Sequence, residues 1–232
     1  MMYSCNNPDV WKIFPSITIM RRGTGQRAGK NRRDYINIIS GFDIETTRIE
    51  SINNSVMYIW QWHFYDLDTN TPIITIYGRT WQEYLDICRK ISDMIHSIPS
   101  QYPLYMVRLI HNLSYEFQFL SAFYEYQPQD VFAIDKRKVA RADSFNCIED
   151  RCTFIHSNMS LAKYAQTWHT EHQKLSGEEF SYIKKRYSWT PMTEQELAYC
   201  ENDVLAMVEA YVAEMKFNSD NIYTIPLLQR AM

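Results

Sequence analysis

Two acidic residues at the end of a predicted strand are the first that could carry out chemistry. The stretch IISGFDIETT, residues 38–47, begins as an apolar strand and ends with Asp43 and Glu45. Residues two apart on a strand point to the same face, so both carboxylates would lie side by side. Like charges at this spacing repel, and their burial is costly unless a cation compensates. Taken alone, the pair leaves two interpretations open, a divalent-cation site and a solvated strand end.

Two further carboxylates lie in distant segments. Glu116 lies in HNLSYEFQFL, where a predicted buried strand passes into a helix, and α/β proteins form sites at such junctions. Asp203 lies in YCENDVLAM on a predicted helix, and Tyr199 lies one turn earlier on the same helix face. Considered singly, Asp203 is typical of a cap or an ion-pair partner, and Tyr199 is typical of a core aromatic.

Four carboxylates from three segments predict a site for two divalent ions, Mg²⁺ or Mn²⁺. Such ions prefer oxygen ligands, and two of them about 4 Å apart promote cleavage of phosphodiesters. One ion would lower the pKa of a bound water, and the other would stabilise the leaving oxygen. The hydroxyl of Tyr199 would orient the attacking water, so that no His or Lys base is required.

The hydrophobic pattern predicts the elements that would position these residues. Strands are predicted at residues 35–46, 56–67, 71–78 and 103–112. Helices are predicted at residues 81–96, 115–126, 161–169 and 193–217. Thr80 is the expected N-cap of the first helix, and Thr193 and Glu196 form a capping-box pattern at the last.

The order of these elements favours one α/β domain with a mixed sheet flanked by helices. The first three strands are expected to form a meander, with the fourth added parallel through the first helix. Residues 130–145 and 150–158 are expected to form a further hairpin.

Composition and charge exclude several classes of protein. The chain has 232 residues, 46% of them hydrophobic, and it shows no signal-peptide pattern and no apolar run that would span a bilayer. Its five cysteines follow no disulfide or zinc pattern, which favours reduced thiols. We therefore expect a cytoplasmic monomer without a membrane partner. Residues 21–33 carry six basic residues and no acid, which is typical of a solvated segment or of a phosphate contact.

Three segments, in the order FDIETT, HNLSYEF and YCENDV, resemble the three exonuclease motifs of family B DNA polymerases. The likeness is to the protein-primed polymerases of phages and related elements, and it covers about residues 35–212. It implies a DEDD exonuclease with a ribonuclease H-like fold that removes nucleotides from the 3′ end of single-stranded DNA, in the host cytoplasm if a phage encodes it. It also implies that Asp43, Glu45, Glu116 and Asp203 bind the metal ions and that Tyr199 positions the water.

The same resemblance implies which residues hold the DNA strand. SLAKY is similar to a DNA-binding motif of the family, and KLSGEEFSY is similar to its lysine motif, although the latter alignment needs a gap. Stacking on an aromatic ring and polar contacts to the backbone are the usual means of holding a single strand. The matching residues are Thr46, Asn112, Tyr115, Ser160, Leu161, Tyr164, Lys174 and Tyr182.

One departure from the motifs and one missing module qualify these expectations. The second motif normally presents Asp, and Glu116 reaches about one methylene further, which affects the expected rate more than the type of reaction. No Asp-x-Asp pair of a polymerase palm follows Asp203, so no polymerase activity is expected of this chain.

The expected organisation has three parts. Residues 1–34 would form a flexible basic arm, residues 35–217 the exonuclease domain, and residues 218–232 a tail similar to the link to a polymerase palm. A polymerase module of the same or a split protein is therefore an expected partner. The alternatives are a free-standing DEDD nuclease that acts on RNA or short oligonucleotides, and a non-catalytic module that binds single strands.

Overall fold

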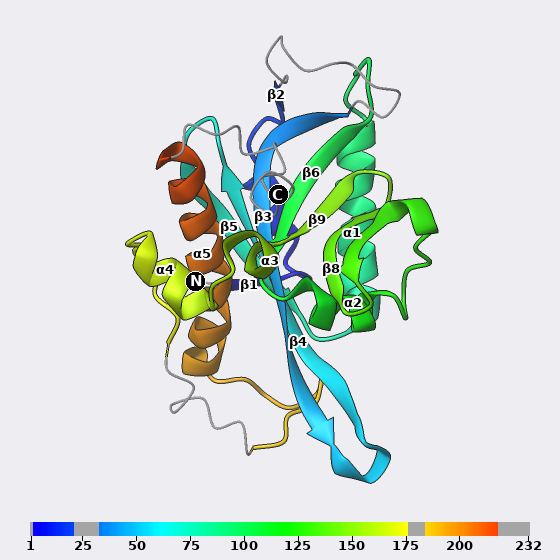
Figure 1. The fold of residues 1–232 in the computed structure, drawn as a ribbon, viewed down its shortest axis with the longest axis vertical. Helices are drawn as coiled ribbons and strands as arrows, with labels where there is room; N and C mark the ends of the chain where they lie inside the picture. The colour runs from blue at the N-terminus through cyan, green and yellow to red at the C-terminus, as the bar shows by residue number, and fades with distance from the viewer. Residues whose placement is uncertain (1, 21–32, 176–183, 218–232) are drawn as a thin grey trace.

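A mixed β-sheet forms the centre of the computed structural model, which describes residues 2–20, 33–175 and 184–217 (Figure 1). The strand order is β1-β5-β4-β3-β6-β9-β8-β7, and β2 pairs with β3 beside this path. The strands are β1 Met2–Ser4, β2 Ile19–Met20, β3 Asp34–Ile49, β4 Asn54–Asp66, β5 Thr71–Gly78, β6 Leu104–Ile110, β7 Val131–Asp135, β8 Lys138–Ser144 and β9 Ile148–Cys152. This arrangement confirms the predicted α/β class.

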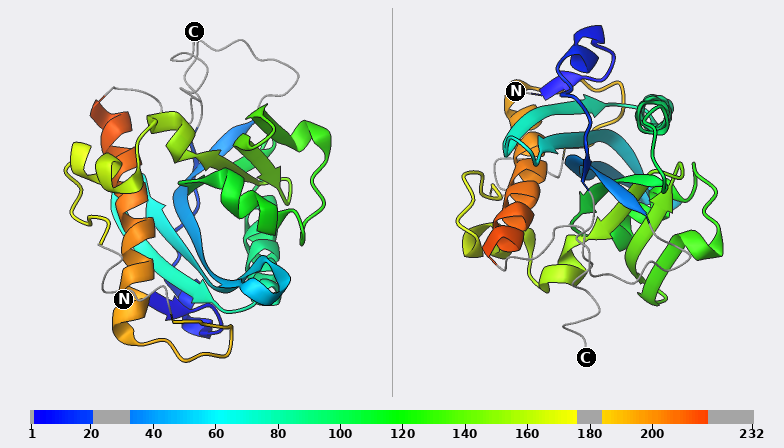
Figure 2. Two further views of the ribbon diagram at one scale, coloured as in Figure 1. Left: turned by 60° about the horizontal axis from the view of Figure 1, so that its bottom comes forward. Right: turned by 90° about the horizontal axis from the view of Figure 1, so that it is seen from above.

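Helices cover both faces of the sheet, with α5 and α1 on opposite sides (Figure 2). The alternation along β3 explains this, because Ile36 and Phe42 pack in the same core cluster as α1, whereas Tyr35 and Ile39 pack in the cluster with α5. The helices are α1 Trp81–His96, α2 Leu113–Leu120, α3 Thr153–Ser157, α4 Leu161–Thr167 and α5 Glu194–Phe217, and the 3₁₀ turns are η1 Pro8–Lys12, η2 Glu50–Ile52 and η3 Pro128–Asp130.

The predicted core of the sheet is correct. β3, β4 and β5 form an antiparallel meander, and β6 adds to β3 in parallel through α1. β5 and α1 have the predicted bounds, and α1 begins with a capping box formed by Thr80 and Glu83. Thr193 and Glu196 make the reciprocal capping bonds at the start of α5, as their spacing predicts.

The prediction of a separate N-terminal arm is wrong for residues 2–20. β1 pairs in parallel with β5, β2 pairs antiparallel with β3, and the side chain of Val10 is fully buried. Strands of two or three residues are too short to show a periodic pattern and depend on pairing with distant strands. Residues 21–32 of the basic run and the predicted tail 218–232 lie outside the described residues.

The predicted hairpin after α2 is partly wrong. β7 and β8 form a hairpin, but the next strand, β9, ends at Cys152 and is followed by α3. β9 also pairs in parallel with β6, so it belongs to the main sheet. α2 ends at Leu120, six residues before its predicted end. None of the helices in the described ranges has the length and apolarity to cross a membrane.

Candidate functional site

The acids of the first and third motifs converge between β3 and α5. Asp43, Glu45 and Asp203 each offer a carboxylate oxygen, and these oxygens all lie within 4.8 Å of one another. β3 supplies the first two from the sheet face that α5 covers, and α5 supplies Asp203 from its buried side. Two elements far apart in the sequence therefore build one carboxylate cluster.

The acid of the second motif joins this cluster from α2. Glu116 lies in the first turn of α2 and is 4% exposed. Its carboxyl group lies close enough to that of Asp43 for the charge of Asp43 to raise the pKa of Glu116 beyond the rise that burial causes. Glu116 therefore lies beside the carboxylate cluster, and its role as a metal ligand stays a prediction.

Burial favours the protonated form of these four acids. It raises the pKa of Asp43 to about 7, although part of that side chain stays accessible, and repulsion from Asp203 adds to the effect. Burial also raises the pKa of Glu45 and of Glu116, and the charge of Asp43 raises both further. The cluster therefore carries an electrostatic cost that a bound cation would remove.

Lys174 offsets part of this electrostatic cost at Asp203. Its Nζ lies 2.7 Å from Asp203 Oδ2 and opposes the rise in the Asp203 pKa that burial causes. Among the described residues, Asp203 Oδ1 is buried and has no hydrogen-bond partner. A buried, unpaired carboxylate oxygen among hard oxygen donors fits a Mg²⁺ or Mn²⁺ ion.

A second group with possible metal ligands is less suited to this role. Glu171, His172 and Glu209 also place ligand atoms within 4.8 Å of one another. However, His172 already occupies both oxygens of Glu209, through its backbone N–H at 3.0 Å and its ring Nδ1 at 2.6 Å. Glu171 is exposed and the other two side chains are only partly buried, so burial costs this group less than it costs the first cluster.

A β-bulge beside Glu45 shapes the packing around Tyr199. The register between β3 and β4 shifts after Glu45, so that Tyr58 is an extra residue on β4. Tyr58 and its neighbour Ile59 both pack in one buried cluster with Tyr199, which is 4% exposed. The bulge therefore lets two consecutive residues of β4 contact the helix turn that precedes Asp203.

One further contact to the cluster comes from Gln61, which the sequence analysis missed. Its Nε2 donates to Asp43 Oδ2 at 3.1 Å, and the two residues are direct partners in the antiparallel register. The predicted meander already placed the two strands side by side. To identify Gln61 as the partner of Asp43 also requires the register between the two strands, which the sequence pattern did not fix.

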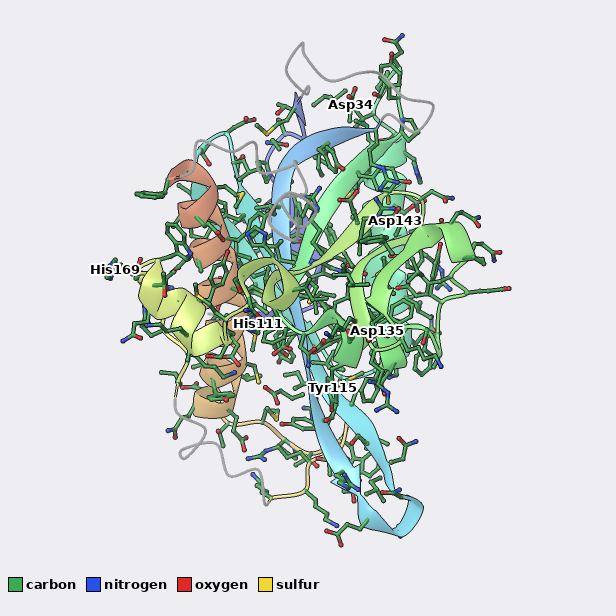
Figure 3. The ribbon with its side chains drawn as sticks, viewed as in Figure 1. Asp34, His111, Tyr115, Asp135, Asp143 and His169 are labelled. Carbon is green, nitrogen blue, oxygen red and sulfur yellow. The ribbon has the colours of Figure 1, made fainter. Side chains whose placement is uncertain are left out.

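Three of the predicted strand-binding residues lie next to Glu116. Thr46 Oγ1 and the hydroxyl of Tyr115 are 2.6 Å apart and share a hydrogen bond. Tyr115 lies near the base of the projecting β3–β4 hairpin, and Asn112 is exposed immediately before α2 (Figure 3). These side chains border the carboxylates on the α2 side.

The SLAKY segment has a structural role. Ser160 caps α4 by accepting from the backbone N–H of Lys163, and Leu161 is 7% exposed in the core. The ring of Tyr164 is fully buried, and its hydroxyl donates to Glu214 Oε2 at 2.6 Å. A fully buried ring offers no surface to a base, so the expected direct contact of Tyr164 with DNA does not agree with this structure. Tyr182 lies outside the described residues.

The close approach of α5 to β3 depends on Gly41. A Cβ at this position would lie 2.6 Å from Val208 Cγ2 and 3.1 Å from the Val204 carbonyl oxygen. We expect Gly41→Ala to push α5 away, to lower the free energy of unfolding by about 1–3 kcal/mol and to displace Asp203. Urea unfolding would measure this, and the double variant Gly41→Ala/Val208→Ala should regain part of the loss. Unchanged stability in Gly41→Ala would contradict the packing argument.

Comparison with known proteins supports the fold. No protein-family model and no curated protein matches the chain. Phi29 DNA polymerase complexed with primer-template DNA is similar to it at a TM-score of 0.60 and 13% identity, over 80% of this chain and 32% of the polymerase chain. The same polymerase complexed with single-stranded DNA gives a TM-score of 0.58 at 12% identity, over 80% and 33% of the two chains. The chain thus spans about a third of the polymerase, and the shared architecture is consistent with the predicted ribonuclease H-like fold.

Proposed function

We propose that the chain is a metal-dependent 3′→5′ exonuclease that hydrolyses phosphodiester bonds at the 3′ end of single-stranded DNA. One observation carries this proposal, namely the carboxylate oxygens of Asp43, Glu45 and Asp203 within 4.8 Å of one another, in the order and on the elements of the exonuclease motifs that they resemble. The two similar polymerase structures are complexes with DNA, which supports DNA as the substrate class.

The carboxylate cluster would hold the metal ions. Asp43, Glu45 and Asp203 are the proposed ligands, with Glu116 beside Asp43. Bound Mg²⁺ or Mn²⁺ supplies Lewis-acid activation of a water and stabilises the leaving oxygen. Burial raises the pKa of both Asp43 and Glu116, and each would give up its proton on binding, because a ligand must be deprotonated to bind a metal.

The remaining residues would bind and orient the strand. The hydrogen bond between Thr46 and Tyr115 holds both side chains beside Glu116, where they would contact the terminal nucleotide. Lys174 would exchange part of its contact with Asp203 for a phosphate oxygen. Tyr199 is fixed one turn before Asp203 and would orient the attacking water.

The proposed unit comprises residues 35–217 together with the N-terminal strands that complete its sheet. A polymerase module of the same or a split protein remains the proposed partner, because the chain matches about a third of the polymerase chains similar to it.

Labelled oligonucleotides test the proposal directly. We expect release of mononucleotides from a 3′-labelled single strand of DNA in Mg²⁺ or Mn²⁺, a stepwise ladder from the same strand labelled at its 5′ end, and no release in EDTA. A matched RNA strand should be cut more slowly. Internal fragments without a ladder, or equal rates in EDTA, would contradict an exonuclease, whereas faster cutting of RNA would reassign only the substrate.

A further inference from the structure

We propose that Tyr187 and Trp189 form a stacking platform for the bases of a single-stranded nucleic acid, next to the carboxylate cluster. This inference rests on the proposed function and extends it, because it assigns a contact for nucleotides that precede the 3′ end. None of the three motifs contains these two residues. The platform lies in the segment 184–193, which leads into α5.

The two rings offer an open π-face to solvent. They stack in parallel, with centroids 4.9 Å apart and an angle of 6° between their planes. Trp189 is 78% exposed, although large aromatic side chains are usually well buried. Exposed aromatic faces are what proteins use to bind successive bases of a single strand without regard to sequence.

The turn that carries the rings is held in place. Arg79 Nη2 donates to the carbonyl oxygens of Tyr187 and Thr190, each at 2.8 Å. The backbone N–H of Tyr187 donates to Thr190 Oγ1 at 2.9 Å, and the N–H of Thr190 donates back to the carbonyl of Tyr187. Because these bonds fix the backbone before any ligand arrives, binding would cost little ordering of the turn.

The platform lies beside the proposed active site. The backbone N–H of Arg186 donates to Thr47 Oγ1 at 3.0 Å, which joins this segment to β3 two residues after Glu45. Arg79 Nε also donates to the carbonyl oxygen of Tyr58, the bulged residue of β4. In Figure 1 the segment runs from the beginning of α5 to the base of the β3–β4 hairpin.

The local charge favours a polyanion as the occupant. Lys185 is exposed, Lys184 is exposed and reaches Glu196 at 3.2 Å, and no acidic residue occurs between Lys184 and Thr193, although the whole chain has a net charge of -3. Arg186 is buried and paired with Glu196, so it serves to hold the segment. Cationic side chains beside stacked aromatic rings match the backbone and the bases of a single strand.

Binding of a fluorescein-labelled oligothymidylate in EDTA tests the platform without any cutting. We expect Trp189→Ala to raise Kd about tenfold, the effect of losing one stacked base, and Trp189→Phe to restore most of the affinity. Trp189→Leu keeps an apolar side chain without a π-face and should bind as weakly as Trp189→Ala. Phe217→Ala is the matched control, because Phe217 is 79% exposed at the opposite end of α5.

Kinetics separate this contact from a structural role. Trp189→Ala should raise KM for a long strand while kcat stays unchanged, and it should leave cleavage of a dinucleotide unaffected, because a dinucleotide reaches only the carboxylates. An equal loss of kcat on both substrates would indicate a damaged fold and would overturn the assignment.

The outcomes distinguish the two proposals. Equal Kd in Trp189→Ala and wild type, with metal-dependent cutting intact, overturns the platform and leaves the exonuclease standing. If Trp189→Ala binds the strand more weakly and the wild-type chain cuts nothing, the platform is supported and the exonuclease is overturned. Equal affinity of Trp189→Leu and wild type would show that binding needs no π-face at this position and would overturn base stacking.

Discussion

The variant Asp43→Asn is expected to lose at least about a thousandfold in the rate of nucleotide release, which corresponds to several kcal/mol of transition-state stabilisation. Asp43 is the centre of the carboxylate cluster, because its charge raises the pKa of both Glu45 and Glu116 and its carboxylate lies within 4.8 Å of those of Glu45 and Asp203. An amide in its place is a poor ligand for a hard cation. Binding of a single strand in EDTA should change little, since Thr46 and Tyr115 keep their contact.

The same variant should make the metal-free chain more stable at pH 8. Burial raises the pKa of Asp43 from 3.8 to about 7, so the folded chain binds this proton more tightly than the unfolded chain does. Wild-type stability therefore falls as the pH rises from about 4 to about 7, and stays lower above that range. Asp43→Asn lacks this loss. We expect its free energy of unfolding to exceed that of wild type by on the order of 1 kcal/mol at pH 8, and we expect the difference to disappear near pH 4.

Thermal unfolding with and without Mn²⁺ checks both effects. Mn²⁺ should raise the Tm of wild type, because a ligand that binds only the folded state stabilises it, and it should raise the Tm of Asp43→Asn much less. Asp93→Asn, at an exposed acid of α1, is the matched control and should behave as wild type. Wild-type activity in Asp43→Asn would refute the assignment of the first motif.

The largest loss of stability is expected at Arg108, far from the chemistry. Arg108 and Asp150 are direct partners on β6 and β9, and both side chains are completely buried. Two bonds join them, Nε to Oδ1 at 2.5 Å and Nη2 to Oδ2 at 2.9 Å, and the guanidinium lies 4.6 Å from the centroid of the Trp62 ring. Arg108→Leu leaves a buried carboxylate unpaired and should cost about 3–5 kcal/mol of unfolding free energy.

Urea unfolding of a double-mutant cycle measures this pair. Arg108→Leu/Asp150→Leu should recover much of the loss, because two apolar groups replace the pair and no charge remains. The single variant should be less destabilised at acidic pH, since Asp150 can then keep its proton and stay neutral. Burial already favours the protonated form of Asp150 in the wild type, where Arg108 opposes it. A cost below about 1 kcal/mol for Arg108→Leu would show that water reaches the pair.

The parts of the fold that follow from the sequence depend on local interactions. The capping boxes at Thr80 and Thr193 involve partners three residues away, so a single sequence displays them. The apolar run of β6 likewise reflects burial on both faces, whereas the alternation of polar and aromatic residues along β4 does not, because residues 57–66 are all buried. The acids of the three motifs could be predicted as site residues because the motifs follow one another in the order of the family that they resemble, and the structure brings these acids together.

The remaining features depend on contacts between distant residues, which no local pattern specifies. Arg186 bonds Thr47 across 139 positions, and the extra residue at Tyr58 appears only when β3 and β4 are aligned. β1 is three residues long and is defined by its pairing with β5. Tyr164 was misjudged for a related reason, because its motif suggested a DNA contact while its partner, Glu214, lies 50 positions away.

The bulge at Tyr58 separates the part of the sheet that carries the carboxylates from the outer end of the β3–β4 hairpin. This outer end projects beyond the rest of the sheet (Figure 1). Arg79 anchors the bulged carbonyl, and the exposed residues Asn53 and Asn54 lie at the far tip. Changes in length at this tip would be absorbed before they reach Glu45. Asn53 and Asn54 also line one hollow together with Tyr115, so a fluorophore on the outer hairpin would report the arrival of a strand at that side chain.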